Sequence, residues 1–484
     1  MDTAFSSAAD QLAAMRRGEI TSIELTDAAI ARIEALDGKI NAVCVPDFER
    51  ARAAARRSDA ARAAGDDRPL LGLPVTVKES FNIAGLPTTW GIPASRDFIA
   101  DADAVQVTRL TDAGAVILGK TNVPLFLGDL QSYNDIYGTT NNPWDLTRTP
   151  GGSSGGSAAA LAAGYGALSI GSDIGGSLRT PAHFSGVYAH KPTFDLLASR
   201  GHTPPGAPAL PSSVDMAVVG PMARTAPDLT LLFDVMAGPD PLTEGIAYRT
   251  QVPAPRHDRI ADFRALVLTD HPLVPTGSAV RAAVEWIAST MESQGAQVIR
   301  SCEALPDLGV VAALYSEMLM AELAAAFPPE VYRTLAAQAD GLAPDDTSLD
   351  AARLRGAAST HRAWIESARR REVIRHRWRQ VFDEVDVVIA PITPTPAFPH
   401  DHTPNPHARR LDVDGVEISF NDQLLWAGVA TLPGLPATAI PTGLSEQGLP
   451  VGVQLIGPMF EDRTPLRLAE LLADEIGGFV APEL

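Results

Sequence analysis

The sequence has very little cysteine and no long apolar run. Only Cys44 and Cys302 occur among 484 residues, so neither a disulfide framework nor a multi-thiolate metal site can be built. We expect two free thiols in a reducing compartment. The most apolar stretch, residues 158–170, contains Gly164 and Gly166 and is too short to span a bilayer. No basic segment followed by an apolar run opens the sequence, so we expect a cytoplasmic protein with no membrane partner.

Positive charge is scarce relative to negative charge. The chain has 39 Lys plus Arg residues against 58 Asp plus Glu residues, which gives a formal net charge of −19. Because an acidic surface repels phosphate backbones, we expect no nucleic-acid partner. The hydrophobic fraction of 45% is ordinary for a globular protein. A chain of 484 residues can bury a large core.

The first 65 residues are expected to form an N-terminal helical segment, residues 1–65. Thr21 and Glu24 have the spacing of a capping box, and apolar residues with helical spacing follow them. Gly38 is predicted to end this helix as its C-terminal cap. A second helix, rich in alanine and arginine, is predicted at residues 47–65 on the solvent side.

Short β-prone runs then alternate with helical stretches. The predicted strands lie at residues 74–77, 115–118, 168–170, 266–268, 387–389, 438–440 and 451–455. The predicted helices include residues 102–113, 157–163, 227–236 and 277–294. This alternation predicts an α/β fold around a mixed sheet. Residues 304–379 are expected to form a helical layer or lid, and the proline-rich segments 203–212 and 238–255 are expected to be surface loops.

Glycine and serine are concentrated in one stretch, residues 150–192. It holds two clusters, residues 151–157 and 171–177, with an apolar run between them that a flexible linker would not contain. Glycine allows positive φ and a close approach of the backbone to a ligand. Successive free N–H groups can form a nest for an oxyanion. A hydroxyl at the end of such a nest, that of Ser177, is well placed to be a nucleophile.

Several motifs in and around this stretch are specific. The runs PGGSSGGSA, GSDIGGSLRTPA and HKPT resemble the signature of the amidase signature family. The run GLPVTVK, residues 72–78, resembles the strand that carries the family's catalytic lysine, and Ser153 and Ser177 keep the family's spacing between its two serines. The runs GAVILGKTN, NNPWD, DVVIAPITPTPA and LPVGVQLIGP extend the resemblance over most of the chain.

The resemblance implies an amidase signature fold, which has a large central mixed β-sheet covered by helices on both faces. A single amidase domain would span residues 1–484. The resemblance also implies a triad in which Ser177 is the nucleophile, Ser153 the bridging serine and Lys78 the general base. The peptide bond between Gly152 and Ser153 is cis in this family. The implied oxyanion hole consists of backbone N–H groups of Ile174, Gly175, Gly176 and Ser177. Neither a metal nor an organic cofactor is implied.

The implied reaction is hydrolysis of a carboxylic amide C–N bond through an acyl-enzyme. A lysine acts as a base only in its neutral form, so its surroundings must favour that form. Lys78 lies in an otherwise apolar strand, where burial would make the charged form costly. The residue type and its position therefore fit the implied role.

Two other patterns suggest different chemistry. Residues 114–121, GAVILGKT, match the spacing of a phosphate-binding loop, but the four residues between the glycines are predicted to be strand. We therefore expect Lys120 and Asn122 to hold structure together near the site. A metal could be bound by a cluster in a proline-rich segment, His400, Asp401, His402 and His407. That segment is predicted to be an exposed loop, so no metal site is expected.

Charged residues within the signature have simpler interpretations. His183 and His190 could suggest a serine–histidine mechanism, but no Gly-x-Ser-x-Gly elbow surrounds Ser177. A histidine base is therefore not expected. Asp173 and Arg179 are predicted to form a structural pair that fixes the glycine-rich turn.

The predicted substrate-binding residues are mostly apolar or aromatic: Leu125, Gln131, Tyr133 and Leu178. Further pocket walls are expected from Ile174 and from residues 125–137, 314–327 and 420–426. This lining favours a small aryl or alkyl amide, anilide or carbamate as the small-molecule substrate. A homodimer is possible.

Two alternatives stay open at this point. One is a glutaminase subunit that passes ammonia to a partner enzyme, because that family relative shares the same triad. The other is a binding protein that kept the scaffold without activity, although all three catalytic positions are intact in this sequence.

Overall fold

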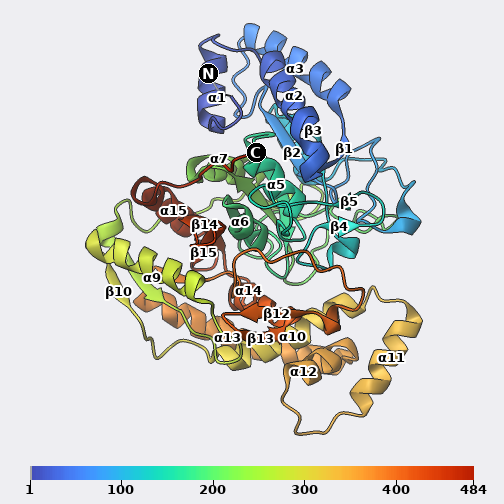
Figure 1. The fold of residues 1–484 in the computed structure, drawn as a ribbon, viewed down its shortest axis with the longest axis vertical. Helices are drawn as coiled ribbons and strands as arrows, with labels where there is room; N and C mark the ends of the chain where they lie inside the picture. Colours follow the sequence, from blue (N-terminus) through green and yellow to red (C-terminus); the bar gives the residue numbers. More distant parts are fainter. Residues whose placement is uncertain (1–2) are drawn as a thin grey trace.

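The computed structural model describes residues 3–484 (Figure 1). One sheet contains β1 (Val43–Pro46), β2 (Pro74–Lys78), β3 (Val116–Thr121), β6 (Leu168–Asp173), β7 (Tyr188–Lys191), β8 (Val218–Ala223), β9 (Arg264–Val267), β10 (Gln297–Ile299), β11 (Val387–Pro391), β14 (Ala437–Leu444) and β15 (Pro450–Ile456). Two hairpins lie outside it, β4 (Tyr133–Asn134) with β5 (Gly138–Thr139) and β12 (Arg410–Val413) with β13 (Val416–Ser419). The α-helices are α1 (Ala8–Arg16), α2 (Ser22–Ile40), α3 (Phe48–Ala63), α4 (Val105–Asp112), α5 (Gly155–Ala162), α6 (Arg179–Ser185), α7 (Ala226–Met236), α8 (Glu244–Ala247), α9 (Ser278–Ser293), α10 (Leu308–Ala324), α11 (Pro329–Asp340), α12 (Leu349–Ala357), α13 (His361–Glu384), α14 (Leu424–Thr431) and α15 (Arg463–Ile476).

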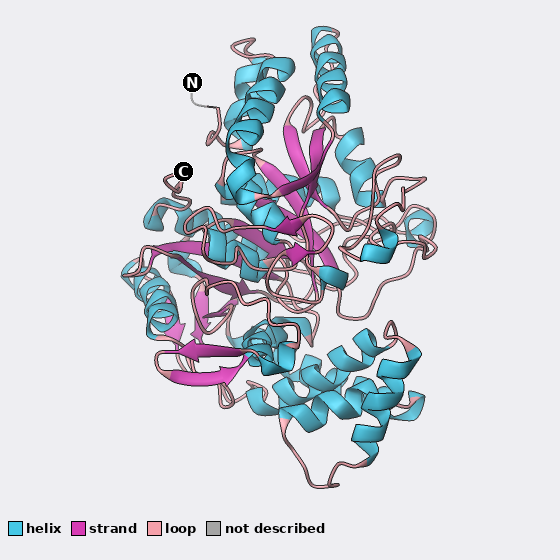
Figure 2. Cartoon of the chain, turned by 45° about the vertical axis from the view of Figure 1, so that its right-hand side comes forward, coloured by secondary structure: helices cyan, strands magenta, loops and turns pink. Residues whose placement is uncertain are grey.

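The 11-stranded sheet has the order β1-β3-β2-β6-β8-β7-β14-β15-β11-β9-β10. It is mixed, as predicted: β3, β2 and β6 pair in parallel near one end and β11, β9 and β10 near the other, with antiparallel strands between them (Figure 2). The carboxyl ends of β2 and β6 therefore lie side by side. Ligands of α/β sheets bind beyond such carboxyl ends.

Helices cover both faces of the sheet. On one face, strand residues such as Val77 and Leu455 pack with α4, α7, α9 and α15. On the other face, Ala390 and Ile456 pack with α10, α13 and α14, while α5 and α6 cover the centre. Successive side chains of a strand point to opposite faces, which is why the neighbours Leu455 and Ile456 belong to different cores. The prediction of a sheet covered on both faces is confirmed.

The N-terminal segment is helical, but its first long helix ends later than predicted. The capping box of Thr21 and Glu24 is present at the start of α2. Gly38 lies inside α2, which continues to Ile40, so the prediction that Gly38 is the cap was wrong. Asn41 is the C-cap instead, with φ 56°, and its N–H bonds to the carbonyl of Asp37. Asparagine tolerates the left-handed region, so no glycine is needed there.

The helix-rich region predicted at residues 304–379 is formed by α10, α11, α12 and α13. Figure 1 shows these helices in the lower part of the molecule, with α11 at its edge. Helix α11 has no fully buried residue, whereas α10 buries much of its length against the sheet and α14. The helical layer is therefore attached to the rest of the protein through α10 and α13. A lid function for it stays a prediction.

Four strands of the sheet were not predicted. Strands β7 and β8 carry polar or strand-breaking residues, among them His190, Lys191 and Pro221, yet every residue in them is buried. Strands β1 and β10 are only four and three residues long. The predicted helices and the other strands are present, with ends that differ by a few residues from the predicted ones.

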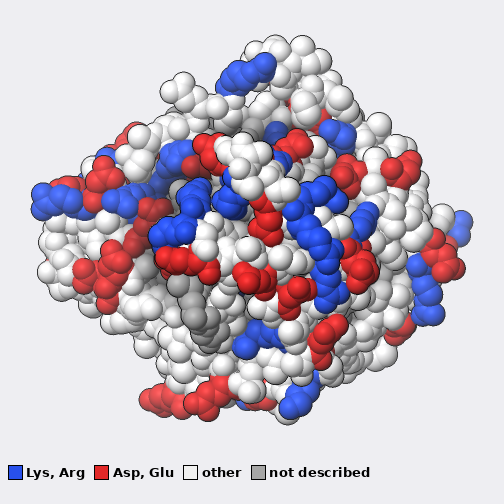
Figure 3. Space-filling view, turned by 90° about the horizontal axis from the view of Figure 1, so that it is seen from above, with Lys and Arg blue, Asp and Glu red and all other residues white. Residues whose placement is uncertain are grey.

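Acidic and basic side chains are mixed on the face seen from above, and no continuous patch of one sign is visible there (Figure 3). Among residues 3–484, no helix has both the length and the apolar character needed to cross a membrane.

Candidate active site

Three segments meet at the carboxyl edge of the parallel strands. Lys78 is the last residue of β2, and β6 ends nearby at Asp173. Ser153 and Ser154 directly precede α5, the central helix that packs on the same strands. Residues far apart in the sequence are thus brought together by strand pairing and one short helix.

Lys78 is the centre of the site. Its Nζ lies 2.7 Å from Ser153 Oγ, 3.0 Å from Ser154 Oγ and 2.9 Å from Ser172 Oγ. The lysine is fully buried, and all three serines are buried as well. A charged amine can donate to all three oxygens, while a neutral amine can donate to two and accept from the third. The site therefore satisfies both protonation states of the lysine.

Burial favours the neutral form of this lysine. It lowers the pKa of Lys78 from 10.5 to about 7, although the negative charge of Asp173 acts in the opposite direction. A lysine with such a pKa exchanges protons readily near neutral pH, as a general base must.

The bridging position has the backbone geometry that the family resemblance implied. The peptide bond between Gly152 and Ser153 is cis. Gly152 lies against a second segment, because a Cβ placed on it would be 2.7 Å from the amide nitrogen of Gln131 and still closer to the carbonyl of Asp129. Only glycine fits at this position. The chain around Ser153 is thus held by direct contact with residues 129–131.

The glycine-rich loop that ends at Ser177 is anchored by Asp173. Its carboxylate accepts from the amides of Gly176 at 2.9 Å and Leu178 at 3.1 Å. It also pairs with Arg179, with 2.9 Å between Asp173 Oδ1 and Arg179 Nη2, and both side chains are fully buried. Burial opposes ionisation of Asp173, but Arg179, Lys191 and the amide of Leu178 together favour it, and the pKa falls to about 2. The prediction that this pair fixes the turn is supported.

Arg179 joins the loop to the far end of the sequence. Its guanidinium also donates to the carbonyl of Ala427, to Gln454 Oε1 and to Thr431 Oγ1, at 3.1, 2.8 and 2.8 Å. Every one of these distances is within hydrogen-bonding range. A buried guanidinium is tolerated only when it is paired and hydrogen-bonded in this way.

Ser177 is buried, and its carbonyl accepts from the amide of Ser154 at 3.2 Å. Its hydroxyl has no hydrogen-bond partner among residues 3–484, so the direct link to Ser153 in the implied triad stays a prediction. In the same part of the chain, the amides of Gly175 and Ser177 also have no acceptor. The amide of Ile174 has no acceptor in this segment either, whereas that of Gly176 is already bound to Asp173. Ile174, Gly175 and Ser177 are therefore the better candidates for an oxyanion hole.

The four residues predicted to contact the substrate differ in their surroundings. Leu125 is 49% exposed. Tyr133 stacks on His402 with ring centroids 3.9 Å apart and accepts from Arg409 at 2.7 Å. Gln131 is fully buried, and its amide group pairs with the backbone of Asp401 at 2.7 and 2.9 Å.

The fourth of them, Leu178, is fully buried beneath the loop, in the same cluster as α5 and α6. Gln131 and Leu178 therefore have structural contacts, and their contact with a substrate stays a prediction. The expected pocket wall at residues 420–426 also differs, because Trp426 is fully buried and packs edge-on against His271.

The side chains that the sequence analysis excluded from phosphate binding and catalysis have structural contacts. Residues 116–121 form strand β3, as predicted, and Lys120 donates to Thr88 Oγ1 at 2.9 Å and to the carbonyl of Pro87. His183 contacts the carbonyl of Thr395 and the amide of Gly452, and burial lowers its pKa to about 4.

His190 contacts Thr438 and Asp462 through its two ring nitrogens. Neither His183 nor His190 has a ring nitrogen free for a catalytic role. Within residues 3–484, no group of three or more potential ligands could hold a metal ion. His400 bonds to Asn141 at 3.0 Å, and His402 is stacked on Tyr133.

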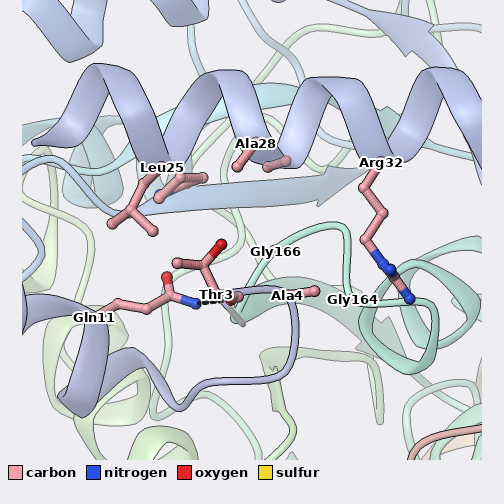
Figure 4. A pocket seen from close by; sticks show the side chains of 10 residues that line it. Thr3, Ala4, Gln11, Leu25, Ala28, Arg32, Gly164 and Gly166 are labelled. Atoms are coloured by element: carbon pink, nitrogen blue, oxygen red, sulfur yellow. Dashed lines mark hydrogen bonds between the residues drawn. The ribbon is translucent and has the colours of Figure 1, made fainter. Parts of the chain in front are cut away.

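Two cavities lie away from these catalytic candidates. One of about 30 Å³ is lined by Thr3, Gln11, Arg32 and the start of β2, as Figure 4 shows, whereas Lys78 is at the other end of that strand. The second, of about 290 Å³, lies among α10, α11, α12 and α13 and is lined by Glu322, Tyr332 and Trp364. Neither cavity contains a residue of the implied triad.

Two residues of the site were missed from the sequence. Ser154 and Ser172 also lie within hydrogen-bonding distance of Lys78, at 3.0 and 2.9 Å, whereas Ser153 is at 2.7 Å. A signal was present, because Ser154 follows Ser153 in the run PGGSSGGSA and Ser172 precedes Asp173 in the second cluster.

The fold and the buried Lys78 cluster define an enzyme that acts on amide C–N bonds. The chain belongs to the amidase family, whose profile matches residues 24–466. It is 37% identical to the A subunit of the glutamyl-tRNA(Gln) amidotransferase of Roseiflexus castenholzii (strain DSM 13941 / HLO8), over 94% of this chain and 93% of that relative.

Solved structures agree with this assignment. A chain from the inhibitor-bound form of a vestigial protein complex, which reveals the evolutionary origins of an s-triazine catabolic enzyme, is 33% identical with a TM-score of 0.81. The alignment covers 98% of this chain and 99% of that one. A 6-aminohexanoate cyclic dimer hydrolase complexed with substrate is 27% identical with a TM-score of 0.76, over 98% of both chains. The amidase signature fold and the hydrolytic class are thereby established for this chain.

Proposed function

We propose that this enzyme hydrolyses small amides through an acyl-enzyme on Ser177, with Ser153 and Lys78 as the proton relay. The observation that carries the proposal is the fully buried Lys78, hydrogen-bonded to Ser153 at 2.7 Å. A buried lysine with hydroxyl neighbours and a pKa of about 7 has the properties of a general base.

The proposed reaction begins with two proton transfers along this relay. Neutral Lys78 takes the proton of Ser153 while Ser153 takes the proton of Ser177, and Ser177 Oγ adds to the carbonyl carbon of the substrate. The resulting oxyanion is stabilised by the free amides of Gly175 and Ser177. Ser153 then gives a proton to the departing amine and is reprotonated by Lys78. Water, deprotonated by the same relay, attacks the acyl-enzyme, and the carboxylic acid leaves with Ser177 restored.

The surroundings of the loop favour an apolar acyl group. A Cβ on Gly175 would lie 3.2 Å from Leu424, and Ile174 packs against the neighbouring apolar cluster. Leu125 and Phe126 are each 49% exposed, so they are available to a ligand. These side chains support an aryl or alkyl amide, anilide or carbamate as the substrate.

A second candidate is a glutaminase that supplies ammonia to a partner protein. It is favoured by the 37% identity to the A subunit of a glutamyl-tRNA(Gln) amidotransferase. The same serine and lysine chemistry would serve both functions, so the catalytic residues do not distinguish them. The difference lies in the substrate and in whether a partner protein is needed.

The test is product release from four substrates: glutamine, a fatty primary amide, p-nitroacetanilide and an aryl carbamate. Wild-type protein is compared with Ser177→Ala and with Ser293→Ala, an exposed serine on α9 that serves as the matched control. We expect wild type and Ser293→Ala to cleave an apolar substrate and Ser177→Ala to cleave none. Turnover by Ser177→Ala near the wild-type rate would overturn the assignment of the nucleophile.

The same panel separates the two candidates. Cleavage of the anilide, carbamate or fatty amide by the purified chain supports a free-standing amidase. Cleavage of glutamine alone, or only after a second protein co-purifies, supports the glutaminase candidate and would overturn the apolar-substrate proposal.

A further inference from the structure

Tyr315 of α10 reaches into the candidate active site from a distant part of the sequence. Its hydroxyl donates to the carbonyl of Ile174 at 2.9 Å, across a separation of 141 residues. Ile174 opens the loop that leads through Gly175 and Gly176 to Ser177. The side chain of Tyr315 is 1% exposed. One buried hydroxyl thus binds the backbone of the loop that carries the proposed nucleophile.

The position of the tyrosine ring is fixed by close packing. A Cβ placed on Gly428 would lie 2.5 to 2.9 Å from three atoms of the ring, so the ring occupies the space that a larger residue would need. A Cβ on Gly175 would lie 3.4 Å from the tyrosine oxygen. The hydroxyl therefore lies directly against the Ile174–Gly175 peptide unit, and the ring packs directly against α14 at Gly428.

The geometry of a peptide unit links the hydrogen bond at the Ile174 carbonyl to the direction of the Gly175 N–H. The unit is planar and trans, so its C=O and N–H point in opposite directions. Holding the carbonyl of Ile174 toward Tyr315 turns the N–H of Gly175 to the opposite side. Hydrogen bonds in a chain also polarise one another, so donation to the carbonyl makes the N–H a stronger donor.

We propose that Tyr315 is a positioning residue of the oxyanion hole, and that it acts by orienting and polarising the N–H of Gly175 through the Ile174 carbonyl. The proposal rests on the proposed function, since it assumes an oxyanion on the substrate at Ser177. In this proposal a side chain of the helical layer, outside the glycine-rich signature, sets the strength of one hydrogen bond to the oxyanion.

The hydroxyl is suited to this role at every working pH. Burial and the nearby charge of Asp173 raise the pKa of Tyr315, so the group stays protonated and can only be a donor toward the carbonyl. The other anchor of the loop, Asp173, binds the amides of Gly176 and Leu178. The two anchors therefore hold the peptide units on either side of Gly175 and the unit after Ser177, and they leave the amides of Gly175 and Ser177 free.

The experiment compares wild type, Tyr315→Phe and Tyr188→Phe. Tyr188 is the matched control, because it is equally buried at 1% exposure and its hydroxyl has no partner among residues 3–484. Each protein is assayed with p-nitroacetanilide and p-nitrophenyl acetate, and its affinity for phenylboronic acid is measured. The boronic acid adds to the serine oxygen and places a negatively charged oxygen where the oxyanion would form.

We expect Tyr315→Phe to lower kcat about 10- to 100-fold on both substrates, less than the loss on removing a direct oxyanion donor. KM should change little, and affinity for phenylboronic acid should fall by a similar factor to kcat. Tyr188→Phe should match wild type in all three readouts. If Tyr315 contributed only to folding, Tyr315→Phe would lower the amount of active enzyme. The correctly folded fraction would then bind phenylboronic acid as tightly as wild type does.

A second variant protects the test against a loss of folding. Gly428→Ala keeps the hydroxyl of Tyr315 but forces its ring away, and it should show the same pattern of lowered kcat and weakened boronic acid binding. Unchanged kcat and unchanged boronic acid affinity in folded Tyr315→Phe would overturn the proposal. If instead wild type lacks activity, or Ser177→Ala retains it, the proposed function itself fails, and that outcome is visible before Tyr315 is changed.

Discussion

The rate of hydrolysis should rise with pH because the proposed base is a buried lysine. Burial lowers the pKa of Lys78 to about 7, and only the neutral amine can accept a proton. At pH 6 about a tenth of the enzyme would have neutral Lys78, and at pH 8 about nine tenths. We therefore expect kcat/KM to increase about tenfold between these two values, with half of the maximum near pH 7.

The assay is kcat/KM on a neutral substrate from pH 5.5 to 9, together with tryptophan fluorescence to check that the fold is unchanged. Lys78→Arg is the first control. A guanidinium keeps its charge throughout this range, so the variant should be inactive at every pH. Lys191→Met is the second control, because burial also lowers the pKa of Lys191 to about 7. If Lys78 is the titrating group, Lys191→Met keeps the midpoint near pH 7, whatever its absolute rate.

Three results would refute this reasoning. A midpoint above about pH 9 would mean that burial does not favour neutral Lys78. A rate that falls with rising pH would mean that the charged amine is the active form. A pH profile that survives in Lys78→Arg, or that disappears in Lys191→Met, would assign the titration to another group.

Two further changes test the support of the site. Asp173→Asn leaves the fully buried Arg179 without its charged partner, so the free energy of unfolding should fall by about 3–5 kcal/mol; a loss below about 1 kcal/mol in urea unfolding would contradict the anchoring role. Gly152→Ala should abolish turnover, because the added Cβ would overlap the backbone of the facing segment, whereas Gly128→Ala should be tolerated, since its Cβ meets only a carbonyl at 3.5 Å. Equal activity of the two alanine variants in the amide assay would show that the close approach at Gly152 does not matter.

Sequence patterns predicted those helices and strands whose own residues determine their secondary structure. Apolar runs such as residues 387–389 and 451–455 became β11 and β15. The missed strand β7 contains His190, which looks out of place in a buried strand until its partner Asp462 is known. That partner is 272 residues away, so no local pattern could reveal it. The end of α2 was misjudged for a simpler reason, because both Gly38 and Asn41 can end a helix and only the fold selects between them.

The same difference between local sequence patterns and long-range contacts applies to the candidate active site. Ser153 and Lys78 were predicted from motifs that lie within continuous runs of sequence, and the structure joins them by a hydrogen bond. The sequence could not show that Gln131 binds the backbone of Asp401, 270 residues away, and its contact with a substrate stays a prediction. Tyr315 was included only within the range of a pocket wall, because its contact with Ile174 depends on how α10 packs against the loop.

The difference between the residues that the sequence predicts and those that it does not has a physical basis. Lys78, Ser154 and Ser172 come from the ends of two paired strands and the helix beside them, and that unit brings them together with few long-range requirements. Tyr315, which orients the loop, comes instead from α10, 141 residues away from Ile174 in the sequence. The signature therefore predicts candidate catalytic residues. In our proposal the strength of the oxyanion contact and the choice of substrate depend instead on side chains outside it, such as Tyr315 and Leu424. We infer that enzymes with this signature can change substrate by altering the helical layer while Lys78 and its serines stay in place.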